Sequence, residues 1–139
     1  MDVLLNVPKH ADLIYDVGMH KGEDTWFYLQ KGFRVIGFEA DPTLAQHCRE
    51  RFREFIREGR LTLVEGAIVD PGSVKAGSQK VRFYRNDKNS VWGTVAADWA
   101  DRNVQLGAPS QIVEVDAIDF VSVIQRYEMP HYMKIDIEE

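Results

Sequence analysis

The 139-residue sequence contains a single cysteine, Cys48, and no long apolar run. One cysteine cannot form a disulfide within the chain, which is typical of a reducing compartment. Apolar runs extend over only a few residues, far short of the roughly 20 needed to span a bilayer. The N-terminus has no basic leader before an apolar stretch. We therefore expect a cytoplasmic protein that does not associate with membranes.

An excess of positive charge is also missing. The sequence has 17 Lys and Arg against 22 Asp and Glu, for a formal net charge of −5. Residues 1–112 are balanced, and residues 113–139 carry the whole imbalance, with seven acids against Arg126 and Lys134. Because phosphate binding needs a basic face, this distribution argues against a nucleic-acid partner. The lone cysteine and the four scattered histidines match no zinc-ligand spacing, so no metal site is predicted.

What the sequence does contain is ordinary globular composition, with 45% hydrophobic and 28% charged residues. Its length is that of one domain, spanning residues 1–139. Strand and helix signals alternate up to residue 65: strands at 13–17, 34–39 and 61–65, and helices after Gly22 and from Pro42 to Gly59. Asp41 and Pro42 form a strong helix start. This pattern predicts a parallel βαβαβ arrangement and an α/β fold.

The alternation changes after Asp70. Two strand-like segments, 81–84 and 112–116, predict an antiparallel insertion beside the main sheet, with a short helix between them at 94–106. We expect Asp116 to cap a further helix, Pro130 to interrupt it, and residues 132–137 to form a fourth parallel strand. The predicted strand order is third, second, first, fourth.

The loop from Asp16 to Gly22 carries the strongest functional signal. It leaves a strand and enters a helix, and its two glycines permit a tight turn and close approach of a ligand to the helix N-terminus. Glu39 follows Gly18 by 21 residues, at the end of the next strand, where an acid in such a fold accepts hydrogen bonds from ribose hydroxyls. A nucleotide-like ligand is the favoured interpretation, although a glycine turn at a strand–helix junction is also common in structural loops.

The glycine pattern does not match the dinucleotide motif. G-x-x-x-G lacks the middle glycine of G-x-G-x-x-G, which brings the backbone against a pyrophosphate. An NAD-dependent oxidoreductase therefore remains an alternative, supported by the Glu39 spacing alone. A binding module without catalytic activity is a further alternative.

The sequence resembles the FkbM-type S-adenosylmethionine-dependent methyltransferases in five segments that follow the family order. They are YDVGMHKGEDT (15–25), VIGFEADP (35–42), LVEGAIVD (63–70), VEVDAIDF (113–120) and MKIDIE (133–138). The resemblance implies a Rossmann-like class I methyltransferase sheet with helices on both faces. His20 stands where the family commonly has asparagine, and Glu139 stands where the family has glycine before further strands.

The resemblance also implies a site. It places the methionine end of S-adenosyl-L-methionine near Asp16, Gly18 and Gly22, the ribose on Glu39, the adenine near Gly66 and Ala67, and the transferred methyl opposite Asp136. The implied reaction is methylation of a hydroxyl oxygen on a small molecule or glycan. Because the family's later strands do not follow residue 139, we expect low activity from this chain and self-association through its exposed fourth strand.

Overall fold

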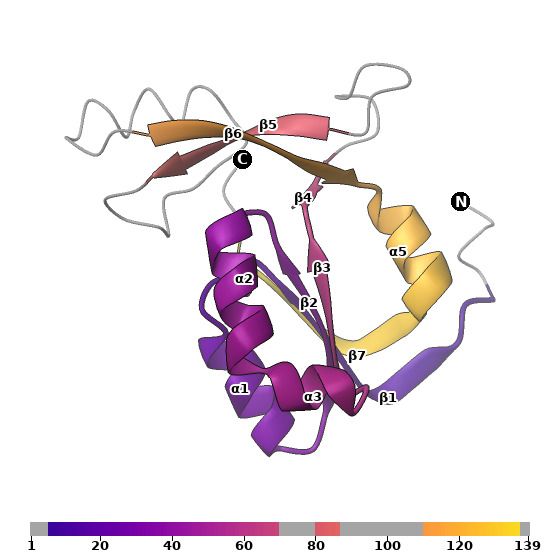
Figure 1. The fold of residues 1–139 in the computed structure, drawn as a ribbon. Coiled ribbons are helices and arrows are strands. Elements are labelled where there is room, and N and C mark those ends of the chain that lie inside the picture. The colour runs from indigo at the N-terminus through magenta and orange to yellow at the C-terminus, as the bar shows by residue number, and fades with distance from the viewer. Residues whose placement is uncertain (1–5, 70–79, 87–109, 137–139) are drawn as a thin grey trace.

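The computed structural model describes residues 6–69, 80–86 and 110–136 (Figure 1). Its main sheet has four parallel strands in the order β3-β2-β1-β7. These strands are β1 (Lys9–Val17), β2 (Arg34–Glu39), β3 (Leu61–Glu65) and β7 (Met129–Ile135). The α/β class and the predicted strand order are confirmed.

One face of the main sheet packs against α5 (Phe120–Tyr127). Alternate residues of β1, among them Leu13 and Tyr15, join Val123 and Ile124 of α5 in one buried apolar cluster. Side chains alternate across a strand, so the residues between them point to the opposite face.

That opposite face is covered by α1 (Glu23–Gln30), α2 (Pro42–Arg51) and α3 (Arg53–Arg57). Its apolar cluster contains Val35 and Leu61 from the sheet together with Leu29, Cys48 and Phe52 from the helical layer. Helices therefore lie on both faces, as expected for a parallel sheet whose strands are buried on both sides. Figure 1 shows α1, α2 and α3 on one side of the strands and α5 on the other.

The helix predicted from Pro42 to Gly59 is two helices. Its start is as predicted, because the Asp41 side chain accepts a 2.8 Å hydrogen bond from the Thr43 N–H. The helix breaks at Phe52, whose backbone has φ −108° and ψ 23°. The apolar stripe nevertheless continues across the break, because Phe52 stays 1% exposed.

A second sheet, in the order β4-β6-β5, lies beyond the carboxyl ends of β2 and β3 (Figure 1). It consists of β4 (Ala67–Ile68), β5 (Lys80–Asn86) and β6 (Ser110–Ile118). β5 and β6 pair antiparallel, whereas β4 and β6 pair parallel. β4 was not predicted, because a pair of residues shows no periodicity. The helix predicted at 94–106 falls outside the described residues.

Asp119, not Asp116, is the N-cap of α5. The Asp119 carboxylate accepts hydrogen bonds from the Val121 N–H at 3.1 Å and the Ser122 hydroxyl at 3.0 Å. Asp116 is part of β6, where it lies opposite Lys80 and forms a 2.6 Å ion pair with it. Pairing with β5 and then β4 extends the strand to Ile118 and delays the helix.

Pro130 lies within β7 instead of ending a helix before it. It is paired with His10 at an irregularity in the β1–β7 register. Proline is tolerated there because β7 is at the edge of the described sheet, and edge strands accommodate a residue without an N–H. The strand ends at Ile135, two residues before the predicted boundary.

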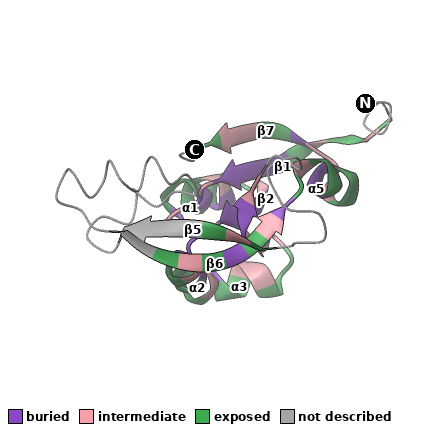
Figure 2. Ribbon diagram, turned by 90° about the horizontal axis from the view of Figure 1, so that it is seen from above, coloured by how far each residue is buried: buried purple, intermediate pink, exposed green. Residues whose placement is uncertain are grey.

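Burial follows these layers. Seen from above in Figure 2, β2 and the second half of β1 are buried in the middle of the molecule, and β7 is only partly covered. Tyr132 and Ile135 of β7 are exposed. None of the helices in the described ranges is long and apolar enough to cross a membrane.

Candidate functional site

The loop between β1 and α1 is fixed to the end of β2. The N–H groups of Gly18 and Met19 both donate to the Phe38 carbonyl oxygen, at 2.9 and 3.0 Å. Gly18 and Gly22 have φ values of 80° and 88°, and His20 has φ 56°. Glycine adopts these left-handed conformations without strain, so the predicted need for glycine at the two turn positions is explained.

Gly22 also borders the protein core. Its missing side chain would point at Phe52, whose ring fills that space. The buried Met19 side chain packs against Gly37 of β2 and so holds the loop against the sheet.

Glu39 joins this loop to the start of α2. Its Oε1 accepts a 2.7 Å hydrogen bond from the His20 N–H, and its Oε2 accepts a 2.9 Å hydrogen bond from the Asp41 N–H. The side chain is 8% exposed. Burial raises the pKa of Glu39 to about 7, against the lowering effect of the backbone hydrogen bonds. The carboxyl group therefore changes charge close to neutral pH.

Asp16 lies beneath the loop and is fully buried. Its Oδ2 accepts a 2.6 Å hydrogen bond from the hydroxyl of Thr25 in α1, and its Oδ1 lies 3.4 Å from the Lys134 Nζ. Burial raises the pKa of Asp16, and the hydrogen bond from Thr25 and the charge of Lys134 oppose that effect. Asp16 is therefore a buried carboxylate with a partner for each oxygen.

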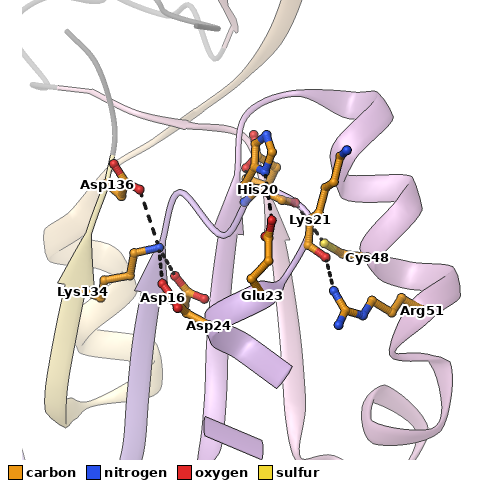
Figure 3. Close-up of polar contacts among 10 residues, drawn as sticks. Asp16, His20, Lys21, Glu23, Asp24, Cys48, Arg51, Lys134 and Asp136 are labelled. Carbon is orange, nitrogen blue, oxygen red and sulfur yellow. Dashed lines mark hydrogen bonds and ion pairs between the residues drawn. The ribbon is translucent and has the colours of Figure 1, made fainter. Parts of the chain in front are cut away.

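Lys134 of β7 is shared among carboxylates from separate elements (Figure 3). Its Nζ lies 3.0 Å from Asp24 of α1 and 3.8 Å from Asp136, in addition to the contact with Asp16. Burial works to lower the pKa of Lys134, but the charges of Asp16 and Asp24 outweigh it and raise the pKa. The ammonium group is therefore charged at neutral pH.

Asp136 follows β7 directly and lies beside the loop. Its N–H donates a 2.9 Å hydrogen bond to the carbonyl oxygen of Val17, the last residue of β1. The side chain is 79% exposed, in contrast to the buried Asp16. It is thus accessible to a second molecule at the same end of the sheet.

Gly66 directly follows β3, and Ala67 is the first residue of β4. The Gly66 N–H donates a 2.9 Å hydrogen bond to the Glu39 carbonyl oxygen. A Cβ at Gly66 would collide with the carbonyl oxygen of Asp116 and the side chain of Ile118 in β6. Ala67 is buried in a small apolar cluster together with Val115 of β6. The sides of both residues that face β6 are therefore filled.

The structure thus brings all the predicted site residues to the carboxyl ends of adjacent strands. Asp16 is the second-to-last residue of β1, Gly18 follows that strand, Glu39 ends β2, and Asp136 follows β7. Sequence analysis missed Thr25 and Lys134. The signal for Lys134 was its position two residues before Asp136, since residues i and i+2 of a strand share a face.

His20 lies in the loop between β1 and α1, and Cys48 of α2 contacts that loop. The Cys48 thiol donates to the His20 carbonyl oxygen at 3.2 Å, and the His20 Nδ1 lies 3.8 Å from a Glu23 carboxylate oxygen. Burial raises the pKa of Cys48 to about 12, so the group is a neutral thiol and no nucleophile. Among the described residues, no group of three or more His, Cys, Asp and Glu side chains is arranged to hold a metal ion.

Comparison with families of known proteins gives one match over most of the chain. A model described as the methyltransferase FkbM domain matches residues 16–139. The match begins at Asp16 and includes every predicted site residue.

Similarity to individual proteins is more local. The probable ribosomal RNA small subunit methyltransferase A of Methanospirillum hungatei is 37% identical over 57 residues, which are 41% of this chain and 22% of that protein. Its counterpart in Haloarcula marismortui is 36% identical over 75 residues, covering 49% of this chain and 26% of that protein. The chain therefore spans about a quarter of the length of these curated relatives.

Two solved structures complete the comparison. A putative O-methyltransferase from Klebsiella pneumoniae is 28% identical and has a TM-score of 0.36, covering 41% of this chain and 27% of that chain. The glycopeptide N-methyltransferase MtfA complexed with S-adenosyl-L-methionine is 12% identical and has a TM-score of 0.38, covering 84% and 69%.

Proposed function

Because the chain belongs to the FkbM methyltransferase family, we propose that it binds S-adenosyl-L-methionine at the carboxyl ends of β1 and β2 and that the family fold uses this site for methyl transfer. One observation carries the proposal. The His20 N–H of the glycine loop donates directly to the Glu39 carboxylate, so the loop and the ribose-binding acid form a single site.

The side chains present suit such a cofactor. Each Glu39 side-chain oxygen accepts one of the two backbone hydrogen bonds described above. A carboxylate offers about four acceptor positions, so Glu39 retains acceptors for the ribose hydroxyls. The negative charge of Asp16 beneath the loop favours the ammonium group at the methionine end. Gly66 and Ala67 are proposed to border the adenine with their backbone.

We propose a hydroxyl group on a small molecule or glycan as the methyl acceptor. When bound, the cofactor would supply an electrophilic methyl group on its sulfonium, for in-line displacement by the hydroxyl oxygen of the acceptor. The protein's part is then to align the two reactants and to receive the hydroxyl proton. Asp136 is proposed for that role, because its exposed carboxylate follows β7 next to the end of β1. The acidic excess of residues 113–139 disfavours RNA as the acceptor.

The experiment is calorimetric titration of the chain with S-adenosylmethionine, S-adenosylhomocysteine and NAD. We expect the first two to bind and NAD not to bind, because the loop lacks the glycine that would admit a pyrophosphate. Glu39→Ala should weaken binding by about 1.5–3 kcal/mol, the range for hydrogen bonds to a charged group. Tighter binding of NAD than of S-adenosylhomocysteine would support the oxidoreductase alternative.

Glu65→Ala is the matched control. Glu65 lies opposite Glu39 in the β2–β3 register, but its carboxylate forms a 2.7 Å ion pair with Arg49 of α2. We expect its replacement to leave S-adenosylhomocysteine affinity unchanged. Equal losses in both variants would show that the effect of Glu39→Ala is a general disturbance of the sheet end, and would remove Glu39 from the proposed site.

A further inference from the structure

Lys134 has no role in the function proposed so far, although it is the centre of the polar cluster in Figure 3. Its ammonium contacts carboxylates that differ in exposure: Asp16 is buried, Asp24 is half exposed and Asp136 is mostly exposed. In the described part of the chain, Lys134 is the one cation paired with Asp16. The point between the three carboxylates is already filled by a cation of the chain itself, so the cluster is not a metal site.

Asp16 needs this cation. A carboxylate without solvent contact loses its hydration and takes up a proton unless charge or hydrogen bonds compensate. Thr25 supplies one hydrogen bond, and Lys134 supplies the opposite charge. Removing the cation would leave a single neutral donor to hold a buried charge.

The other groups that face Asp16 do not replace Lys134. The titratable or charged ones are Asp24 and Tyr28 from α1, Cys48 from α2, and Lys134 with the neighbouring Asp136 from β7. The residue opposite Asp16 on β2 is Gly37, which carries no charge. Apart from Lys134, these groups are acidic or neutral, so they oppose ionisation of Asp16 or leave it unchanged.

We propose that Lys134 is a positioning residue of the cofactor site, which keeps the buried Asp16 carboxylate ionised and fixed beneath the glycine loop and so sets the pH range over which the cofactor binds. The inference rests on the proposed function, since it assumes that the negative charge of Asp16 attracts the ammonium of the methionine end. Lys134 acts through Asp16 and does not itself touch the ligand.

The test uses Lys134→Met, which keeps an apolar stem and removes the charge, and Asp24→Asn, which removes a competing carboxylate. Lys31→Met is the matched control, because Lys31 is the C-cap of α1, where its ammonium lies over the Phe27 ring. The titration of the Asp16 carboxyl carbon is followed by NMR in each protein, with Asp16→Asn to assign the signal. S-adenosylhomocysteine affinity is measured from pH of about 8.5 to about 4, a range that includes the Glu39 titration and extends to the ordinary pKa of an aspartate.

The two variants should shift the Asp16 midpoint in opposite directions. Lys134→Met should raise it by about one pH unit or more, the effect of losing an opposite charge at this range. Asp24→Asn should lower the Asp16 midpoint. The substitution removes a like charge near Asp16, and Lys134 then no longer divides its interaction between Asp16 and Asp24. The ratio of wild-type to Lys134→Met affinity should grow as the pH falls. Glu39 titrates in both proteins, so its contribution cancels in the ratio.

Several results would overturn the inference. They are an unchanged Asp16 midpoint in Lys134→Met, a flat affinity ratio across the pH range, or a shift equal to that of Lys31→Met. If Lys134→Met does not fold, the direction of the Asp24→Asn shift decides alone, and an upward shift or none rejects the proposal. Absence of any S-adenosylhomocysteine binding by the wild type would instead reject the proposed function, independently of Lys134.

Discussion

The ring of Phe52 occupies the space that a side chain on Gly22 would need. A Cβ built on Gly22 would lie under 3.0 Å from two ring carbons, and Phe52 itself is fully buried. Gly22 begins α1, and Phe52 lies between α2 and α3. The second glycine of the loop is therefore required where the loop packs against the helical layer, whatever binds on its other side.

We expect Gly22→Ala to destabilise the protein by about 2–4 kcal/mol, which combines overpacking of a buried ring with a left-handed backbone for alanine. Gly32→Ala is the matched control, because Gly32 has φ 94° and open space around it. That variant should lose only the conformational part, about 1–2 kcal/mol. Urea unfolding measures both free energies of unfolding.

The clash itself can be isolated with Phe52→Ala, which empties the space beside Gly22. In that background, adding Gly22→Ala should cost no more than Gly32→Ala does in the wild type. A double-mutant cycle reports the difference as a coupling energy. If the two glycine substitutions are equally harmful in the wild type, Phe52 does not explain why residue 22 is glycine.

Cofactor affinity should fall as the pH is lowered through about 7, where the Glu39 carboxyl group titrates. The ionised form accepts hydrogen bonds from ribose hydroxyls, and protonation below this pH removes acceptor capacity. Binding should then lower the pKa of Glu39 and release a proton at pH values below about 7. Calorimetry of S-adenosylhomocysteine binding in buffers of different ionisation enthalpy measures this release. The Glu39→Gln variant should bind S-adenosylhomocysteine weakly and release no proton. Proton release that persists in this variant would show that another group is responsible.

Asp136→Asn should abolish methyl transfer and leave S-adenosylhomocysteine affinity within a few-fold, because in our proposal the exposed carboxylate receives the proton of the acceptor and does not bind the ribose. Asp12→Asn is the control, since Asp12 is also exposed but pairs with Arg34 far from the site. Single-turnover transfer of a labelled methyl group, with an acceptor found by screening hydroxylated small molecules and glycans, separates the two. An undiminished rate of methyl transfer in the Asp136→Asn variant would show that Asp136 has no catalytic role.

The outer edge of β7 should pair with a second copy of the chain. In the described sheet β7 has a neighbour on one side only, and Tyr132 and Ile135 are exposed on it. Unpaired strand edges promote association, whereas the acidic residues at its end oppose it. Light scattering should therefore show more association as salt screens that repulsion. Ile135→Lys should reduce it, and Val121→Lys, on the exposed side of α5, should not. A monomer at every salt and protein concentration would contradict this.

Much of the fold could be predicted from the sequence, because up to residue 65 the local sequence patterns agree with the observed structure. The boundaries predicted for β2 and β3 match those observed, since both are apolar runs that end at polar or glycine residues. Beyond residue 65 the sequence was less reliable. Asp116 has the side chain of a helix cap, but it lies in β6 instead, because it pairs there with Lys80 of the neighbouring β5.

The sequence by itself determined the α/β class, the strand order, and which residues gather at the carboxyl ends of the strands, because parallel βαβ units leave little freedom in topology. Only the tertiary structure decided how those residues differ. It buried Asp16 and left Asp136 in solvent, although both lie at the carboxyl ends of adjacent parallel strands. It also placed Lys134 between them, 118 positions along the chain from Asp16. Burial and long-range ion pairs depend on packing between segments distant in sequence, and no local pattern encodes them.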